Sequence, residues 1–303
     1  MTLQQLVYAV KIAETKSMNK AAAELFISQP ALSGAIRDLE EEIHIDLFNR
    51  SNRGVVITTE GEEFLSYARQ MVELQTMIED RYISNRKSKK KFSVSMQHYS
   101  FAVEAFIELA KEFEIEDFEL AVHEAKTSEV IANVRNYRSE IGVLYLNSFN
   151  EKVMRKIFAE NDLEYNPLFQ CHIYVYLSKG HPLAGQAQIS LDELGDYPCL
   201  SFEQGDKNSF YFAEEVFSTS DYKQIIKADD RATMLNLMVG LNGYTLCSGI
   251  ICEELNGEKY KAVPLATDEK MEIGYIKRKS MPLSSLGIRY LSILRQYETH
   301  ILT

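Results

Sequence analysis

Two short helical segments joined by a tight turn constrain the start of this 303-residue chain more than any other feature. The first segment covers residues 19–25, and Asn19 is its expected N-cap. The second begins after Ser28, a favourable N-cap, and its first turn holds Pro30, where a missing N–H costs little. Since only two residues separate the segments, the pattern predicts a helix-turn-helix.

A hairpin and a long helix are expected to follow the helix-turn-helix. Apolar, β-branched residues flank the turn sequence at residues 51–54, which is typical of a two-stranded wing. Thr59 followed by Glu62 is a capping box, so we expect a long helix to begin there and to run to about Tyr82.

The long helix carries a heptad seam, in which spacings of four and three residues alternate. The seam positions are Phe64, Ala68, Met71, Gln75, Ile78 and Tyr82. A helix of about 28 residues is about 42 Å long, which is more than a domain of about 57 residues covers. We therefore expect a homodimer through this seam, with the polar Gln75 setting its register.

The charge of the chain is distributed unevenly. A net charge of −11 argues against a nucleic-acid partner when the chain is taken as a whole. Residues 1–91, however, carry 13 basic and 13 acidic residues, so the entire acidic excess lies beyond them. The first third is therefore electrostatically distinct from the rest, and the basic run at residues 86–91 is expected to be a solvated hinge.

Strand and helix patterns alternate from Phe92 onward. The order over residues 92–146 is strand, helix, strand, helix, strand, which implies a parallel sheet with right-handed crossovers. A second group of elements begins near Asn166. A last strand at 273–276 and a helix at 285–297 are expected to return to the first lobe.

The stretch from Ser17 to Ser33, SMNKAAAELFISQPALS, resembles the DNA-binding segment of the LysR-type transcriptional regulator family. The resemblance continues at Ile36, Leu39-Glu40, Leu47-Phe48-Asn49-Arg50, Arg53-Gly54 and Thr58-Thr59-Glu60-Gly61, and more weakly at 181–184 and 239–243. It implies an α+β and α/β multidomain chain, with an N-terminal winged helix-turn-helix, a long linker helix and a two-lobed α/β effector domain similar to periplasmic binding proteins.

The same resemblance sets the expected domain boundaries. The DNA-binding domain is placed at 1–58, and the linker helix with its hinge at 59–89. The effector-binding domain follows at 90–303, with lobe I formed by 90–163 and 268–303 and lobe II by 164–267. The implied function is a ligand-responsive, DNA-binding transcriptional regulator that is not an enzyme and that changes its grip on operator DNA when a small molecule binds between the lobes.

Candidate DNA-contacting residues lie on the second helix and the wing. The amide of Gln29, at the start of the helix, suits a bidentate pair with adenine. Pro30 and Ser33 share its surface, where phosphates and thymine methyl groups are within reach. Gly34 occupies a position that is often basic in the family, and Arg37 is its expected substitute. Arg50 and Arg53 flank the wing turn and are expected to meet phosphate or the minor groove.

Candidate effector-binding residues lie where strands meet helix starts. Free N–H groups and hydroxyls at such starts favour a carboxylate or another anion, so a small anionic effector is expected. The candidates are Gln97, His98, Tyr99, Ser100, Thr127 and Ser128 in lobe I and Ser201, Phe202, Tyr244 and Thr245 in lobe II.

No cofactor or metal is expected. The four cysteines form no CxxC pair and are expected to be reduced, buried thiols, and the histidines lack metal-ligand spacing. The chain has no apolar run of about 18 residues and its first residues do not resemble a secretory signal, so a cytoplasmic protein without membrane contact is expected.

The expected partners are double-stranded operator DNA, a small effector, further copies of this chain and RNA polymerase. The dimer follows from the seam, whereas a tetramer through the effector domains follows only from the resemblance. The alternative function is a cytosolic small-molecule receptor or carrier built on residues 92–303, against which the helix-turn-helix argues. An α/β enzyme is a third class, but the chain has no GxSxG, phosphate loop or GxGxxG after a strand.

Overall fold

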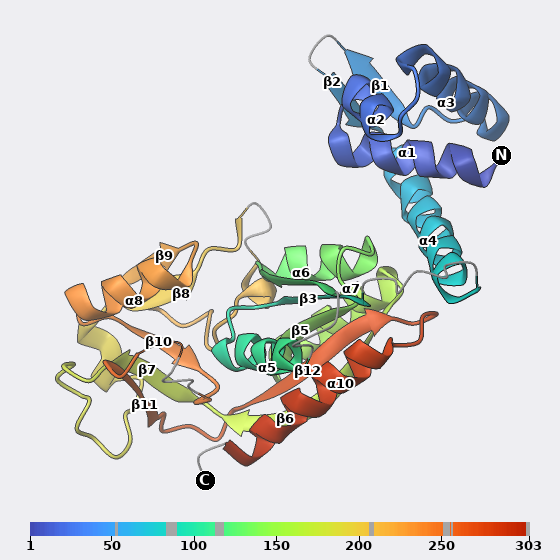
Figure 1. The fold of residues 1–303 in the computed structure, drawn as a ribbon. Helices are drawn as coiled ribbons and strands as arrows, with labels where there is room; N and C mark the ends of the chain where they lie inside the picture. Colours follow the sequence, from blue (N-terminus) through green and yellow to red (C-terminus); the bar gives the residue numbers. More distant parts are fainter. Residues whose placement is uncertain are drawn as a thin grey trace. The chain divides into compact units, whose positions relative to one another are not determined.

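The computed structural model describes residues 1–51, 54–82, 90–112, 118–205, 209–250, 255 and 257–300, without the side chains of residues 50, 51, 77, 80–82, 299 and 300. The chain divides into two compact units, Met1–Ser88 and Lys89–Thr303 (Figure 1). Each unit has its own hydrophobic core.

The first unit is a winged helix-turn-helix followed by a long helix, in agreement with the sequence pattern. Its elements are α1 (Leu3–Thr15), α2 (Met18–Glu24), α3 (Gln29–Ile43), β1 (Phe48–Ser51), β2 (Gly54–Ile57) and α4 (Thr59–Tyr82). Strands β1 and β2 pair antiparallel. The buried faces of the first three helices meet in one cluster that contains Ile12, Ala22, Ile36 and Leu39.

Two helix caps differ from the sequence-based expectation. The N-cap of α2 is Ser17 and not Asn19, since the Ser17 hydroxyl accepts a hydrogen bond from the Lys20 N–H. The N-cap of α4 is Thr58 and not Thr59, because the Thr58 hydroxyl accepts from the Gly61 N–H at 2.9 Å. Each correction moves the cap to a neighbouring hydroxyl residue, which periodicity alone does not distinguish.

Two residues of the family-like pattern hold the wing against the helices. The Glu40 carboxylate accepts hydrogen bonds from the backbone N–H groups of Leu47 at 2.8 Å and Phe48 at 3.2 Å. A side chain at Gly61 would collide with the carbonyl oxygen of Leu47, so the close approach of α4 requires glycine. These positions are therefore explained by the fold.

The second unit contains two five-stranded sheets, one in each lobe. The lobe I sheet has the order β4-β3-β5-β12-β6. Its strands are β3 (Lys90–Met96), β4 (Phe118–Glu124), β5 (Ile141–Leu146), β6 (Leu163–His172) and β12 (Lys270–Arg278). The first three are parallel as expected, but β12 runs antiparallel to both β5 and β6, so the sheet is mixed.

Helices cover both faces of the lobe I sheet (Figure 1). Helices α5 (Ser100–Lys111) and α10 (Ser285–Leu294) pack together on one face, and the short helix η4 (Arg295–His300) follows α10. Helices α6 (Thr127–Arg135) and α7 (Glu151–Glu160) pack on the other face, around Val130, Leu144 and Phe158. Among these helices, α7 was not expected from the sequence.

The lobe II sheet has the order β11-β7-β10-β8-β9. Its strands are β7 (Tyr174–Ser178), β8 (Cys199–Phe202), β9 (Ile225–Ala228), β10 (Tyr244–Cys247) and β11 (Tyr260–Pro264). Helix α8 (Arg231–Gly240) packs on this sheet through Met234 and Met238, and the short helices η1 (Glu193–Asp196) and η3 (Phe210–Phe212) lie in its connections.

The first crossing between the lobes lies later than the expected boundary at residues 163 and 164. Strand β6 pairs with β12 along its whole length, from Leu163 opposite Arg278 to His172 opposite Lys270. Residues 163–172 therefore belong to lobe I, and the chain enters lobe II at Ile173. The strand was missed because it is half-buried, with no clear alternation of apolar and polar residues.

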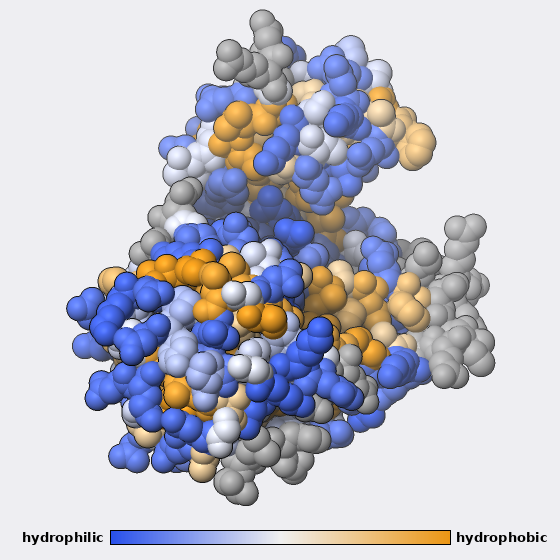
Figure 2. All heavy atoms as spheres, turned by 90° about the vertical axis from the view of Figure 1, so that its left-hand side faces the viewer, coloured by the Kyte–Doolittle hydropathy of each residue, from blue (hydrophilic) through white to orange (hydrophobic). Residues whose placement is uncertain are grey.

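Apolar side chains are exposed on the outer side of lobe II. Ile225 on β9, Val239 near the end of α8 and Leu241 just after it are each about half exposed. Figure 2 shows the corresponding side of the molecule, where apolar patches lie among hydrophilic areas. Among the described helices, none combines the length and the hydrophobicity that a bilayer crossing requires.

Candidate functional site

The exposed face of α3 presents most of the expected DNA-contacting residues. Gln29, Pro30 and Arg37 are exposed, and Ser33 is half-buried. The Arg37 guanidinium lies 3.7 Å from the Glu41 carboxylate, one turn along the same exposed face. Since exposed ion pairs of this kind contribute little, Arg37 is available to a phosphate. A Cβ at Gly34 would meet no atom within 4 Å, so this face is open there.

The structure describes only the backbone of one of the two wing arginines. Arg50 lies on β1, opposite Val55 on β2, and its side chain is outside the described part of the structure. Arg53 lies outside the described residues altogether. Their expected contacts with DNA therefore stay predictions.

Helix α4 has an exposed apolar stripe, but it is not the predicted seam. Ala68 is buried against Leu6 and Val10 of α1, and Phe64 packs against the same group, so these two positions are committed to their own unit. The exposed apolar residues follow spacings of four, three and four: Tyr67, Met71, Leu74 and Ile78.

The exposed stripe shares Met71 and Ile78 with the predicted seam. Its other two members, Tyr67 and Leu74, were not predicted. Gln75 is half-buried and donates a hydrogen bond to Glu79 within α4. The side chain of Tyr82 lies outside the described residues. We call the set Tyr67, Met71, Leu74 and Ile78 the α4 stripe.

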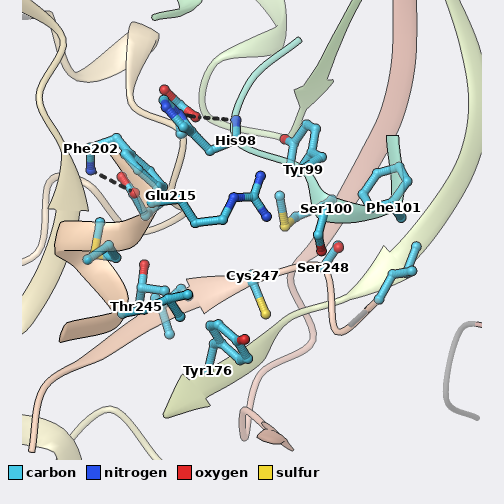
Figure 3. A pocket seen from close by; sticks show the side chains of 17 residues that line it. His98, Tyr99, Ser100, Phe101, Tyr176, Phe202, Glu215, Thr245, Cys247 and Ser248 are labelled. Atoms are coloured by element: carbon cyan, nitrogen blue, oxygen red, sulfur yellow. Dashed lines mark hydrogen bonds and ion pairs between the residues drawn. The ribbon is translucent and has the colours of Figure 1, made fainter. Parts of the chain in front are cut away.

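A cavity with about 700 Å³ of empty space, part of it open to solvent, lies between lobe I and lobe II. Lobe I contributes the residues between β3 and α5, the start of α5, and Met271 of β12, and lobe II contributes residues of β7, β8, β10 and α8 (Figure 3). Figure 3 shows Tyr99 and Ser100 on one side of the cavity and Glu215 and Thr245 on the other. The volume suits a small metabolite.

Five of the ten predicted effector-binding residues line this cavity. They are His98, Tyr99, Ser100, Phe202 and Thr245. Gln97, Thr127 and Tyr244 are instead buried in the protein, and Ser128 is not among the lining residues. Ser201 lines a neighbouring cavity of lobe II together with Cys199 and Tyr222.

The groups of Thr127 expected to bind an anion are used within the protein. Its N–H donates to the side-chain oxygen of Gln204 at 3.1 Å, and its hydroxyl donates to the carbonyl of Phe212 at 2.7 Å. The Gln97 amide donates to the same hydroxyl at 2.6 Å and also accepts from the Tyr99 hydroxyl. The expectation that Thr127 offers free donors to a ligand is therefore wrong for this arrangement of the lobes.

At the start of α5, a carboxylate of lobe II meets lobe I. Glu214 accepts from the His98 N–H at 2.9 Å, and its Oε2 lies 2.8 Å from His98 Nδ1. Its other oxygen accepts from the Gln204 amide at 2.9 Å. The His98 ring also stacks on Phe202, with ring centres 3.7 Å apart. These contacts tie the two lobes together at the rim of the cavity.

Two further ion pairs join the lobes. Arg231, the first residue of α8 and a lining residue of the cavity, pairs with Glu124 at the end of β4. Lys126 lies 3.4 Å from Asp229. The arrangement of the lobes described here is therefore held by several polar contacts in addition to the apolar core.

Glu215 is a buried acid between the two cavities. Burial and, to a lesser degree, the neighbouring Glu214 raise the pKa of its carboxyl group to about 8, although a hydrogen bond from the Phe202 N–H opposes the shift. At neutral pH the carboxyl group is therefore largely protonated and able to donate a hydrogen bond.

Thiol and metal chemistry have little support in the described part of the chain. Burial raises the pKa of the thiols of Cys171, Cys199 and Cys247 to about 12, so they are poor nucleophiles at neutral pH. Cys252 lies outside the described residues. No group of three potential metal ligands occurs among the residues that the structure describes.

Sequence reasoning missed several lining residues of the cavity. They include Tyr176, Glu214, Glu215, Arg231, Met234, Cys247 and Ser248. Arg231 had a local signal, because it follows Asp230, a favourable N-cap, at the start of α8. Glu214 and Glu215 had none, since they lie in an irregular segment, and Glu214 contacts His98, which is 116 residues away in sequence.

Comparison with known proteins assigns both units to one family. The family model described as bacterial regulatory helix-turn-helix protein, lysR family, matches residues 3–62. The model described as LysR substrate binding domain matches residues 98–297, which is more than half of the chain.

Two relatives match over nearly the full length. The helix-turn-helix-type transcriptional regulator YvbU of Bacillus subtilis is 26% identical over 287 residues, covering 90% of this chain and 94% of YvbU. The malolactic fermentation system transcriptional activator of Lactococcus lactis is 26% identical over 303 residues, covering 97% of this chain and 98% of the activator.

Solved structures share the fold. A full-length OxyR variant from Pseudomonas aeruginosa has a TM-score of 0.69 at 19% identity, covering 98% of this chain and 94% of OxyR. Full-length CbnR in complex with its target DNA has a TM-score of 0.59 at 19% identity, covering 98% of this chain and 99% of CbnR.

Proposed function

Because this chain belongs to the LysR family of bacterial transcriptional regulators, we propose that α3 and the wing bind operator DNA and that a small molecule in the interlobe cavity modulates this binding. Members of this family are DNA-binding regulators and not enzymes. The observation that carries the proposal is the presence, in one chain, of a winged helix-turn-helix and a cavity between two lobes.

On DNA, Gln29 is proposed to read a base edge in the major groove, because its amide is exposed at the start of α3. Pro30 and Ser33 contact the adjacent backbone or a thymine methyl group. Arg37, together with Arg50 and Arg53 of the wing, neutralises phosphates. CbnR, which has the same overall fold, was solved in complex with its target DNA, and this supports DNA binding as the role of the first unit.

The DNA-binding form is proposed to be a homodimer through the α4 stripe, assembled into a tetramer through the effector units. The stripe presents apolar residues at heptad spacing, which suits a partner helix. The exposed Ile225, Val239 and Leu241 of lobe II supply apolar surface for the second contact. RNA polymerase is a further proposed partner, and the DNA-binding role places the protein in the cytoplasm.

The effector is proposed to be a small anionic molecule with an apolar part. Arg231 and His98 supply positive or donor groups to the cavity, and Ser100, Thr245 and Ser248 line it as well. Aromatic and sulfur-containing side chains make much of the remaining lining. This composition, mostly apolar with a few polar groups that fix orientation, is typical of a metabolite site.

A band-shift assay with the purified protein and the DNA upstream of its own gene tests the proposal. We expect retardation that weakens steeply with salt, because phosphate contacts release counterions. A thermal-shift screen of metabolites then identifies the effector, since a ligand at 100 times its Kd adds about 2.7 kcal/mol to the free energy of unfolding. Absence of sequence-dependent retardation, or a cationic effector, would contradict the corresponding part of the proposal.

A further inference from the structure

Two lobe II residues, Gln204 and Glu214, reach the starts of two lobe I helices, α6 and α5. Gln204 accepts from the Thr127 N–H at α6, and Glu214 accepts from the His98 N–H just before α5. Helix starts in such positions favour anions because their N–H groups and dipoles point outward. In this chain, acceptors of the protein itself occupy both positions.

Glu214 is held as a bound carboxylate would be held. Both of its oxygens have donors, Gln204 on one and His98 on the other, at 2.8–2.9 Å. The side chains of His98 and Glu214 are only 8% and 4% exposed. A buried carboxylate is costly unless its hydrogen-bonding capacity is satisfied, so this arrangement is specific.

Glu214 also lines the interlobe cavity, next to Ser100, Glu215 and Arg231. Arg231 is itself paired with Glu124 of the opposite lobe. Of the cavity-lining groups suited to a carboxylate, His98 and Arg231 are thus each matched with an internal glutamate across the lobe boundary. A carboxylate that binds to the donors of His98 has to compete with Glu214.

We propose that Glu214 is a tethered carboxylate that fills the effector's anion position, and that a carboxylate-bearing effector binds by displacing it from His98. The inference rests on the proposed function, because it concerns the effector cavity of a regulator. Displacement frees Glu214 from the His98 N–H just before α5, and this breaks a contact that joins the lobes. Ligand binding is thereby coupled to the arrangement of the lobes, as regulation requires.

The test removes the Glu214 carboxylate by substitution and supplies acetate from solution in its place. Glu214→Ala is prepared in the full-length protein, with Glu214→Ser as a second opening variant and Glu214→Gln as a variant that still fills the position. Glu258→Ala, at an exposed glutamate of lobe II, is the matched control. Thermal unfolding is measured in sodium acetate and in sodium chloride at equal ionic strength and pH.

Acetate is expected to stabilise the opening variants alone. At ten times its Kd, it should raise their Tm by about 3–6 °C above the value in chloride. The parent, Glu214→Gln and Glu258→Ala should show no such difference. If neither opening variant gains stability, or if the parent gains equally, the inference is overturned.

A parallel band shift of the parent protein on the DNA upstream of its own gene distinguishes a failure of the tethered-carboxylate proposal from a failure of the proposed DNA-binding role. This measurement does not involve Glu214. Retardation together with no acetate effect refutes the tethered carboxylate alone, whereas loss of retardation with an intact acetate effect refutes the proposed DNA-binding role alone.

Discussion

The two units of this protein assemble their functional surfaces in opposite ways. In Met1–Ser88, the proposed DNA-contacting residues of α3 lie on a single helix that Ser28 caps. In the effector unit, the cavity draws on residues from His98 to Met271. The first surface is therefore local in sequence, whereas the second exists only when distant strands and an irregular segment meet. Substitutions in the first unit should therefore act on DNA binding or assembly, whereas those around the cavity should also change the stability of the effector unit.

The largest effect is expected at the α4 stripe. Met71→Lys places a charge on an apolar seam and should dissociate the helix pair, with loss of operator binding. Light scattering and a band shift measure the two consequences. Thr76→Lys, at an exposed position on the same helix but off the stripe, is the control and should leave the assembly intact. An unaltered assembly of Met71→Lys would remove the stripe from the interface.

Glu215 should make the effector unit sensitive to pH. The pKa of its carboxyl group is raised from 4.5 to about 8 in the folded protein, so the folded state retains a proton that the unfolded state has lost. Its contribution to the free energy of unfolding should therefore fall as pH rises from about 5 to 8, by up to about 1.4 kcal/mol per pH unit.

Glu215→Gln, which mimics the protonated form, should flatten this slope in denaturant titrations at several pH values. The solvent-exposed Glu258→Gln serves as the control and should retain the slope of the parent. Identical slopes in all three proteins would show that the carboxyl group titrates normally.

Gln29→Ala tests the local surface. Loss of a bidentate contact should cost about 1–3 kcal/mol of discrimination at one base pair, with non-specific binding nearly unchanged. Affinities for a set of single-base operator variants measure this. Arg53→Ala should instead weaken binding to all sequences together and reduce the salt slope by about 1. A Gln29→Ala protein that ranks the operators as the parent does would contradict the assignment.

Thr127→Val tests whether a polar side chain of the effector unit serves the fold or the ligand. Because the hydroxyl donates to Phe212 and accepts from Gln97, its removal should cost about 1 kcal/mol or more in stability. The intrinsic contacts with a ligand should be unaffected, since Thr127 is buried away from the cavity lining. Ser128→Ala, on the neighbouring residue, is the control. A Thr127→Val protein with parental stability but a weakened ligand contact would restore the direct role expected from the sequence.

The smallest effect is expected at Gly34. A side chain fits there without collision, and glycine costs a helix interior up to about 1 kcal/mol. Gly34→Lys should therefore raise the Tm slightly and add about one unit to the salt slope of DNA binding. Gly34→Ala separates the effect on stability from the effect on DNA binding, because it should raise the Tm without changing the salt slope. A Gly34→Lys protein with an unchanged slope would place this position away from phosphate.

The sequence by itself determined the parts that depend on neighbours along the chain. Periodicity and capping residues located α3 and the wing, and the predicted order of strands and helices over residues 92–146 matches β3, α5, β4, α6 and β5. Caps were misplaced by one or two residues, because Ser17 and Asn19 are both suitable and only the backbone geometry selects one. The α4 seam was misassigned because periodicity does not say which face of a helix its own domain covers.

Only the tertiary structure decided what surrounds the cavity. His98, Ser100 and Phe202 were predicted because they lie where a strand ends or a helix is about to begin, and such positions follow from local pattern. The burial of Thr127 and the placement of Glu214 against His98 depend on lobe II residues in and just after the short helix η3, which pack on lobe I. Contacts between residues far apart in sequence carry no periodic signal, so whether a polar group faces a ligand or an internal partner is settled only when the lobes are packed together.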